Sequence, residues 1–230
     1  MKSKLNHIAI ILDGNRRYAN KLGLPPWEGH RRGAKKVEEL LNWIVEFDIK
    51  ELTLYCFSIE NFNRSKLEIE YILNLFRSYL KKLYSDKRVK DNKIKINFIG
   101  NLNLFPEDIQ YQMNEITKKT RHYNKYILNL AFGYSGRTEI VEGIKKVIKD
   151  LKEGNIDNID ENKFKEYLYL SSYPDLLIRT GGEKRISNFL LYQVAYTEFV
   201  FLDKLWPEFT KEDFERCIEE FYKRERRFGK

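Results

Sequence analysis

Three short stretches of the sequence combine arginines with a few carboxylates and amides, a mixture suited to binding phosphorylated molecules. The first, DGNRR at residues 13–17, directly follows five apolar residues at 8–12. An apolar run of this length is typical of a strand buried in a parallel sheet, where ligands bind beyond the carboxyl ends of the strands. Gly14 permits a tight turn, and a helix beginning at Asn15 would offer free backbone N–H groups to an anion, beside two arginines.

Asp13 lies where such an anion would bind, although a carboxylate and a phosphate repel each other. A divalent cation between them removes the repulsion, and Mg²⁺ commonly joins carboxylate and phosphate oxygens in this way. The alternative is an ordinary strand-to-helix turn with a solvated basic face. Both interpretations are open for this stretch taken alone.

Two further stretches have the same character, FSIENFNR at residues 57–64 and RTGGEKRIS at residues 179–187. Each follows an apolar run, so parallel strands would bring all three stretches to one edge of a sheet. The arginines gathered there would be Arg16, Arg17, Arg64, Arg179 and Arg185, against chiefly three carboxylates, Asp13, Glu60 and Glu198. This balance favours a site for two polyanionic groups and one metal ion. The residues therefore predict metal-assisted chemistry on a diphosphate.

Motifs of other phosphate and hydrolytic chemistry are absent from the sequence. Neither G-x-x-x-x-G-K-[ST] nor G-x-G-x-x-G occurs, which argues against a nucleotide. The three histidines, His7, His30 and His122, are too dispersed for a zinc site. No serine or cysteine occupies a nucleophile elbow.

The elements that would position these residues alternate between strands and helices. Strand patterns fall at residues 8–12, 52–57, 94–99, 126–132, 176–178 and 196–202. Helical patterns fall at residues 15–21, 34–47, 67–83, 106–123, from the GYSGR segment to 151, within 155–172 and at 210–221. Such alternation predicts an α/β fold of three layers, with a mostly parallel central sheet flanked by helices. The glycines and prolines of residues 21–33 predict a loop there.

Composition is consistent with this interpretation. The 230 residues are 42% hydrophobic, without an internal repeat or linker, so residues 1–230 are expected to form a single domain. A net charge of +8 predicts an acidic partner: nucleic acid, an anionic membrane surface or phosphorylated small molecules. The basic residues are scattered except at the C-terminal KRERRFGK, which argues against nucleic acid.

The cellular location expected from the sequence is the cytoplasm. Cys56 and Cys217 lie in apolar stretches and are interpreted as reduced core residues. There is no signal peptide and no apolar run approaching the ~20 residues of a membrane span. Peripheral contact with the inner face of a membrane is compatible with these features.

In this order and at these spacings, the clusters resemble the cis-prenyltransferase family, the undecaprenyl diphosphate synthases. The similar segments are HIAIILDGNRRYA, GHRRG, LTLYCFSIENFNR, LNLAFGYSGR, DLLIRTGGEKRISNFLLYQVAYTE, LWPEF and RERRFG. The resemblance implies a Mg²⁺-dependent homodimer that condenses isopentenyl diphosphate repeatedly onto an allylic diphosphate, farnesyl or geranylgeranyl. The product would be an undecaprenyl-like polyprenyl diphosphate, the precursor of a glycosyl carrier lipid, and its release would involve membrane contact. The D-D-x-x-D motif of the helical enzymes that make all-trans chains is absent.

The resemblance also implies a role for each matching residue. Asp13 would be the essential carboxylate working with Mg²⁺, Glu198 a second metal ligand, and Asn61 the residue associated with loss of the isopentenyl proton. The implied substrate-binding residues are Gly14, Asn15, Arg16, Arg17, Tyr18 and His30 for the allylic diphosphate, Ser58, Ile59, Glu60, Phe62 and Arg64 at the same mouth, and Arg179, Arg185, Ile186 and Ser187 for isopentenyl diphosphate. Arg227 and Gly229 resemble the family's R-x-G tail, which reaches the partner subunit's site.

Several positions depart from the commonest family pattern. Pro26 stands where many family members have an arginine, which puts one contact to a diphosphate in doubt. Lys184 stands where many have a histidine, which puts a role of that side chain near the metal ion in doubt. These departures suggest a branch away from the best-known bacterial enzymes, and an archaeal one fits. The rival interpretation is a non-catalytic partner subunit, but such relatives lose residues like Asp13 and Asn61, which this chain retains.

A growing polyprenyl chain is apolar, so the domain is expected to enclose an apolar tunnel. Its walls would be the sheet and the helices at residues 34–47 and 67–83, which would explain the wide apolar stripe of the second helix. Tyr126, at the far end of its strand, would either close the tunnel or place its hydroxyl in water. Both alternatives stay open.

Overall fold

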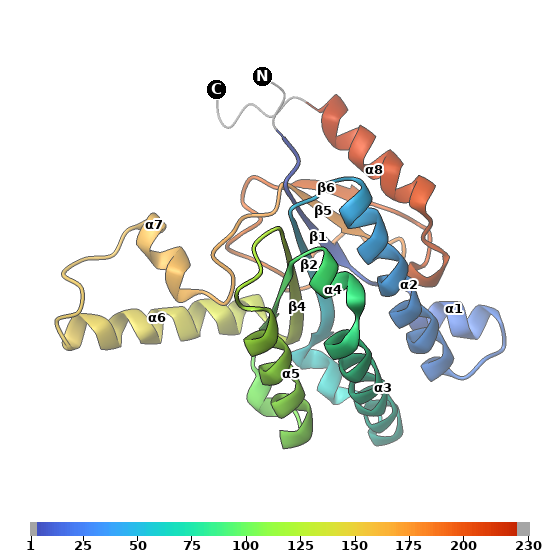
Figure 1. Ribbon diagram of the computed structural model, residues 1–230, viewed down its shortest axis with the longest axis horizontal. Helices are drawn as coiled ribbons and strands as arrows, with labels where there is room; N and C mark the ends of the chain where they lie inside the picture. The colour runs from blue at the N-terminus through green and yellow to red at the C-terminus, as the bar shows by residue number, and fades with distance from the viewer. Residues whose placement is uncertain (1–3, 225–230) are drawn as a thin grey trace.

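A six-stranded, all-parallel sheet forms the centre of the molecule in the computed structural model, which describes residues 4–224 (Figure 1). The strands are β1 (His7–Ile11), β2 (Glu51–Ser58), β3 (Ile94–Ile99), β4 (Tyr126–Tyr134), β5 (Leu176–Arg179) and β6 (Glu198–Phe201). Their order across the sheet is β3-β4-β2-β1-β5-β6, and each neighbouring pair is parallel. β1 therefore lies near the middle, where the direction of strand order reverses. In parallel sheets this is the position at which ligands bind.

Helices flank the sheet, which confirms the predicted three-layer α/β class. They are α1 (Asn15–Lys21), α2 (Pro26–Glu46), α3 (Lys66–Ser85), α4 (Lys87–Asp91), α5 (Glu107–Thr120), α6 (Gly136–Lys152), α7 (Glu161–Phe164) and α8 (Lys211–Lys223). Short 3₁₀ helices lie at η1 (Ile59–Asn63), η2 (Leu102–Leu104), η3 (Lys165–Tyr167) and η4 (Trp206–Glu208). The helices α2, α3, α5 and α8 bury apolar residues in one core on one face of the sheet. A smaller core on the other face is covered by residues 169–194.

Helix α6 projects away from the body and carries α7 near its far end (Figure 1). Within residues 4–224, no helix has the length and apolar composition needed to cross a membrane. Cys217 is buried and Cys56 partly buried, and both are free thiols, as predicted.

The loop predicted over residues 21–33 was wrong beyond Pro25, because α2 begins at Pro26. Proline suits the first helical turn, where its fixed φ is helical and its missing N–H has no intrahelical acceptor. Gly29 and Gly33 are buried inside the helix where it crosses α1. A Cβ at Gly29 would lie 1.9 Å from the carbonyl oxygen of Asn15, and one at Gly33 would lie 2.1 Å from Oδ1 of Asn15. These glycines therefore serve close helix packing and not a turn.

The segment after β6 is fixed to the start of α8 by one buried carboxylate. Asp213 accepts hydrogen bonds from the backbone N–H of Thr210 at 2.9 Å and from Nζ of Lys204 at 2.6 Å, and it also pairs with Arg216. Burial alone would raise the pKa of Asp213, but these hydrogen bonds outweigh it and lower the pKa from 3.8 to about 2. The ionised form is therefore the one that stabilises the fold.

Replacing Asp213 by asparagine is expected to lower the free energy of unfolding by about 2 kcal/mol at pH 7, from the shift of nearly two pKa units. Because the folded-state pKa is depressed, this contribution is present above pH 3.8 and is lost as the pH falls toward 2. Urea denaturation of both proteins between pH 7 and pH 2.5 measures the difference. A difference that did not shrink on acidification would contradict the assignment.

Candidate active site

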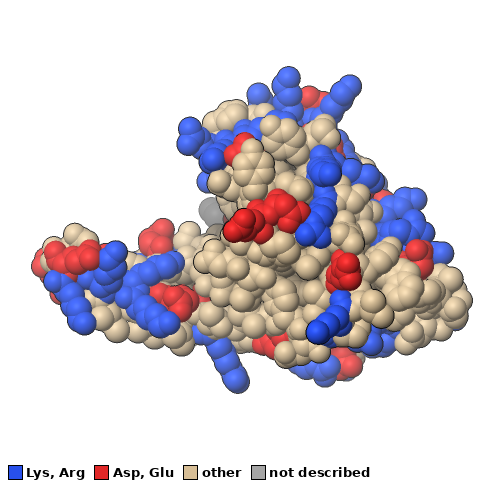
Figure 2. All heavy atoms as spheres, turned by 90° about the horizontal axis from the view of Figure 1, so that it is seen from below, with Lys and Arg blue, Asp and Glu red and all other residues tan. Residues whose placement is uncertain are grey.

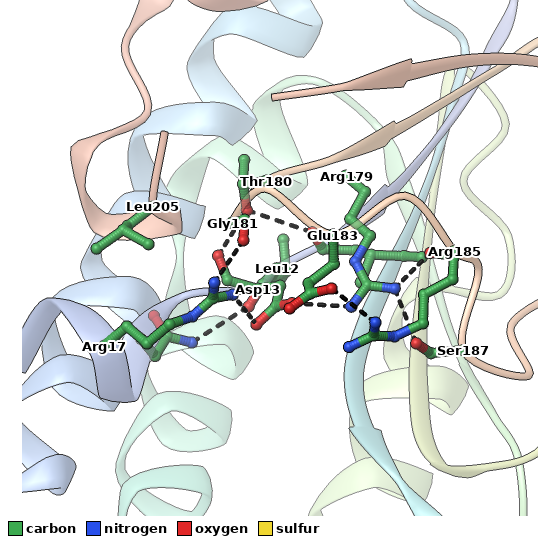
Figure 3. Close-up of polar contacts among 12 residues, drawn as sticks. Leu12, Asp13, Arg17, Arg179, Thr180, Gly181, Glu183, Arg185, Ser187 and Leu205 are labelled. Atoms are coloured by element: carbon green, nitrogen blue, oxygen red, sulfur yellow. Dashed lines mark hydrogen bonds and ion pairs between the residues drawn. The ribbon is translucent and has the colours of Figure 1, made fainter. Parts of the chain in front are cut away.

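Asp13 lies between two arginines at the edge where the strands end (Figure 3). Its Oδ2 accepts a hydrogen bond from Nη2 of Arg179 at 2.8 Å, and its Oδ1 lies 3.1 Å from Nη2 of Arg17. Arg179 ends β5 opposite Ile11 of β1, so the register of the sheet brings it to the turn after β1. The predicted convergence of the first and third stretches is present in the structure.

Backbone contacts fix the turn that carries Asp13. Its carbonyl oxygen accepts from the Thr180 hydroxyl at 2.8 Å and from the Trp206 N–H at 2.9 Å. Gly14 has φ +112°, and a Cβ there would lie 2.9 Å from Leu205. Left-handed backbone and close approach both require glycine. Asp13 is therefore held by rigid elements on both sides.

Arg179 also organises the loop that follows it. Its Nη1 donates to Oγ of Ser187 at 2.8 Å and to the carbonyl of Arg185. Ser187 and the next residue, Asn188, both adopt positive φ, of 48° and 63°. Non-glycine residues take this conformation at a cost that surrounding structure must offset, and such strain is concentrated at functional sites. The Nε–H of Arg179 is buried and has no hydrogen-bond acceptor among the described residues.

A second cluster of basic side chains surrounds Glu68 in the first turn of α3. Its Oε1 lies 3.2 Å from Nε2 of His30, 3.2 Å from Nη1 of Arg64 and 3.8 Å from Nε of Arg16. Burial of the His30 ring lowers its pKa below the usual 6.5, the neighbouring Arg64 lowers it further, and Glu68 opposes both effects. The imidazole is therefore neutral at pH 7. Its Nε2 either donates or accepts a hydrogen bond, depending on the tautomer.

The 3₁₀ helix η1 presents the predicted FSIENFNR residues. Oδ1 of Asn61 accepts from the Ser58 N–H at 3.1 Å, which holds the side chain over the start of the turn. Glu60 accepts from Nδ2 of Asn188 at 3.1 Å. Burial alone would raise the pKa of Glu60, but hydrogen bonds and the nearby Arg137 hold it below 4.5.

A cavity of about 970 Å³ joins these groups to the interior of the domain. Its polar end is lined by predicted site residues, namely Asp13, Asn15, His30, Ser58, Glu60, Asn61, Arg64, Arg179 and Ser187. Its interior is lined by apolar side chains of three elements, namely Val37 and Leu41 of α2, Ile72, Leu75, Phe76, Leu80 and Leu83 of α3, and Leu128, Leu130 and Phe132 of β4. Toward the junction of α3 and α4 the lining becomes charged again, with Lys82, Asp86 and Arg88. The arrangement suits a ligand with an anionic head and an apolar tail.

Sequence reasoning missed Arg137 and Asn188 as lining residues. Nδ2 of Asn188 also donates to Oγ of Ser135, and its Oδ1 accepts from the backbone N–H of Arg137, so it ties the loop after β5 to the start of α6. For Arg137 the available signal was the segment GYSGR at residues 133–137, which runs from the end of β4 into the start of α6.

Some predicted site residues do not line the cavity. Those placed beside it are Gly14, Arg16, Arg17, Tyr18, Ile59, Phe62, Arg185 and Ile186. The guanidinium of Arg185 turns to Glu183, 2.6 Å away, and the Tyr18 hydroxyl accepts from Arg32 at 2.9 Å. The ring of Phe62 packs against Phe57 in the main core. Arg227 and Gly229 lie outside the described residues.

Glu198 lies away from Asp13 within one chain. It begins β6 in register with Leu176, at the opposite edge of the sheet, and pairs with Arg224 at 2.9 Å. No contact among residues 4–224 supports its metal role, which stays a prediction.

The residues at the rim fit Mg²⁺ only if the substrate supplies ligands. In the part of the chain that the structure describes, no three His, Cys, Asp or Glu side chains gather into a metal site. Mg²⁺ is usually held by one or two carboxylates plus substrate phosphates, and Asp13, with its side chain 30% exposed at the mouth of the cavity, offers such a carboxylate. Binding in this mode requires Arg17 or Arg179 to transfer from Asp13 to the phosphate.

The fold and the site together define an α/β protein with a cationic rim at the carboxyl edge of its sheet, joined to a cavity with apolar walls. Comparison with known proteins specifies the family. Residues 11–229 match the family described as "Putative undecaprenyl diphosphate synthase", and the chain belongs to this cis-prenyltransferase family.

Curated relatives and a solved structure support the same family assignment. The chain is 50% identical over 228 residues to a tritrans,polycis-undecaprenyl-diphosphate synthase (geranylgeranyl-diphosphate specific) of Pyrococcus abyssi, covering 97% of this chain and 86% of the relative. A protein of the same name from Thermoplasma acidophilum is 47% identical, with 97% and 88% covered. The crystal structure of lavandulyl diphosphate synthase from Lavandula x intermedia in complex with dimethylallyl diphosphate has a TM-score of 0.92 and 33% identity, covering 98% of both chains.

The position of Asp13 predicts how it affects anion binding. In Asp13→Ala, inorganic pyrophosphate without Mg²⁺ should bind at least as well as in the natural protein, because a negative charge beside Arg17 and Arg179 is gone. Added Mg²⁺ should strengthen binding about tenfold or more in the natural protein and hardly at all in the variant, since one charge-assisted contact is at stake. Titration calorimetry with and without Mg²⁺ measures both effects. Undiminished Mg²⁺ enhancement in the variant would exclude Asp13 as a ligand.

Proposed function

We propose that the protein is a Mg²⁺-dependent cis-prenyltransferase that condenses isopentenyl diphosphate repeatedly onto an allylic diphosphate. The observation that carries the proposal is the continuity of the rim around Asp13 with an apolar cavity of about 970 Å³. A diphosphate group can occupy the cationic rim while the prenyl chain enters the interior. The names of the archaeal relatives favour geranylgeranyl diphosphate as the primer and an undecaprenyl-like product, the precursor of a glycosyl carrier lipid.

In this proposal the cations divide between two diphosphates. Arg17, His30 and Arg64 hold the allylic diphosphate, and Arg179 with Ser187, both of which line the cavity, holds isopentenyl diphosphate. Charge that develops on the departing diphosphate meets fixed arginines that need no reorganisation, which is the usual source of rate enhancement at such sites. Mg²⁺, when bound, neutralises part of the same charge.

Asn61 acts on the acceptor side of this reaction. Its carbonyl oxygen is occupied by the Ser58 N–H, so its amide nitrogen is the end left to face the cavity. A carboxamide is not a base at neutral pH, so Asn61 orients the isopentenyl group and the departing diphosphate accepts the proton that is lost.

The assay that tests the activity uses radiolabelled isopentenyl diphosphate with geranylgeranyl or farnesyl diphosphate and Mg²⁺. Butanol-extractable product that disappears with EDTA supports an enzyme. Its absence with either primer would favour the rival, a non-catalytic partner subunit, and would overturn the proposal.

Product length depends on where the apolar part of the cavity ends. Tyr126 does not line the cavity, and its hydroxyl donates to Asp48 at 3.0 Å, so the hypothesis that its ring closes the tunnel was wrong. The apolar wall instead ends beside Leu83, where Asp86 and Arg88 begin. Burying one further isoprene unit gains ~4 kcal/mol at ~0.8 kcal/mol per carbon, and this gain stops where the walls become charged.

Leu83→Ala is therefore expected to lengthen the product by one or more isoprene units, because it enlarges the last apolar section. The matched control is Tyr126→Ala, which should leave the chain-length distribution unchanged. Mass spectrometry of the extracted products distinguishes the two. A longer product from Tyr126→Ala but not from Leu83→Ala would contradict this and would place the end of the tunnel at the start of β4.

A homodimer is also proposed, supported by apolar surface that the single chain leaves exposed. One face of α6 exposes Val141, Ile144, Ile148 and Leu151, each at least 40% accessible. Their spacing is helical, and Figure 2 shows the same α6–α7 arm standing clear of the body. A second copy would cover this face. Sedimentation equilibrium that found only monomers at micromolar concentration would contradict this.

The proposed location is the cytoplasm, with peripheral membrane contact when product leaves. Apolar side chains near the mouth are exposed, with Leu67 at 77%, Leu22 at 47% and Trp27 at 37%. They lie close in sequence to basic residues such as Lys21 and Lys66. Co-sedimentation with anionic vesicles tests the contact, and no binding at low salt would exclude it.

A further inference from the structure

One carboxylate oxygen holds together three cationic or basic groups of the diphosphate site. Arg16 of α1, His30 of α2 and Arg64 after η1 all lie within 3.8 Å of Oε1 of Glu68. Nη1 of Arg64 also lies within hydrogen-bond distance of Nε2 of His30, at 3.4 Å, so the three groups are packed closely around this one carboxylate. The side chain of Glu68 is 9% exposed, so little solvent screens these interactions.

Glu68 lies behind these groups as seen from the cavity. His30 and Arg64 line the cavity whereas Glu68 does not. The backbone of Glu68 is fixed, because its N–H donates to the N-cap Ser65 at 3.3 Å. Each of the two lining residues therefore has an internal anion on one side and the ligand space on the other.

We propose that Glu68 is a positioning residue that competes with the substrate diphosphate for Arg16, His30 and Arg64, and so limits how tightly the diphosphate is held. This inference rests on the proposed function. A negative charge this close to the cations weakens their attraction for a second anion. The same charge keeps the empty site assembled, because it offsets the repulsion between the guanidinium groups.

The need for such a limit follows from the chemistry of elongation. Each added isoprene unit buries more apolar surface, so the tail binds the growing product ever more strongly. A head group bound with undiminished charge attraction would then leave very slowly. Glu68 recovers its three partners when the diphosphate departs, which favours release.

The experiment compares the binding of inorganic pyrophosphate with Mg²⁺ to the natural protein and to Glu68→Gln by titration calorimetry. If Glu68 competes for the cations, the variant binds about tenfold more tightly, within the usual range of coupling between charged sites. Steady-state turnover should fall by a larger factor than the rate of a single condensation, because release is slowed. Weaker pyrophosphate binding in Glu68→Gln would overturn the proposal and leave Glu68 a purely supporting residue.

Two further variants keep the test decisive. Asp108→Asn removes a carboxylate that pairs with Arg77 between α3 and α5, away from the cavity, and should leave pyrophosphate affinity unchanged. Glu68→Asp keeps the charge but withdraws it by one methylene, so affinity should rise by a smaller factor than in Glu68→Gln. It supplies the test if the glutamine variant does not fold, and an affinity at or below that of the natural protein would then contradict the proposal.

The binding measurement separates this inference from the proposed activity. If the natural protein binds pyrophosphate but forms no polyprenyl product, the proposed function fails and the affinity change in Glu68→Gln still decides the role of Glu68.

Discussion

The structure of the rim depends on the pairing of Asp13 with Arg17 and Arg179. Arg179 is only 4% exposed, and its buried guanidinium is stabilised by an anion in addition to its neutral acceptors on Ser187 and Arg185. Asp13 supplies that anion, and in doing so it joins the ends of β1 and β5 and sets the position of α1. The turn at Gly14 and the strained loop after β5 both serve this contact. Glu68 gives the second cation cluster a counter-ion in the same way. Asp13 and Glu68 thus pair with the same basic groups that a diphosphate would contact.

The second constraint is the amphiphilic cavity between the sheet, α2 and α3. The wide apolar stripe of α3 serves two surfaces, since Ile72 and Leu80 are buried in the main core and also line the cavity. The hydrophobic effect is non-directional, so it can hold a flexible chain of any length that fits. Specificity for position comes instead from the rim, where hydrogen bonds and charges fix the head group. This division between a directional head site and a non-directional tail site accounts for repeated addition at one place.

The sequence was sufficient to predict the sheet and the convergence of its polar strand ends, because apolar runs followed by DGNRR and RTGGEKRIS leave few other arrangements. It misplaced the start of α2, because glycine signals both a turn and close helix packing, and only the nearby Asn15 distinguishes them. The tunnel-closing role of Tyr126 was inferred from its strand, and the metal role of Glu198 from the family resemblance. Where a side chain at a strand end points depends on neighbours such as Asp48 and Arg224, which are distant in sequence. Asn188 was missed because its contacts depend on an αL backbone that sequence pattern does not reveal.

The central claim is that a prenyl diphosphate lies with its head among Asp13, Arg17, His30 and Arg64 and its tail between α2 and α3. A crystal structure with the unreactive analogue geranylgeranyl thiolodiphosphate and Mg²⁺ tests this most directly. The account predicts diphosphate density against Arg17 and Arg64, metal density beside Asp13, and prenyl density along Leu41, Phe76 and Leu83. Prenyl density outside this cavity, or a head group bound away from Asp13, would contradict it.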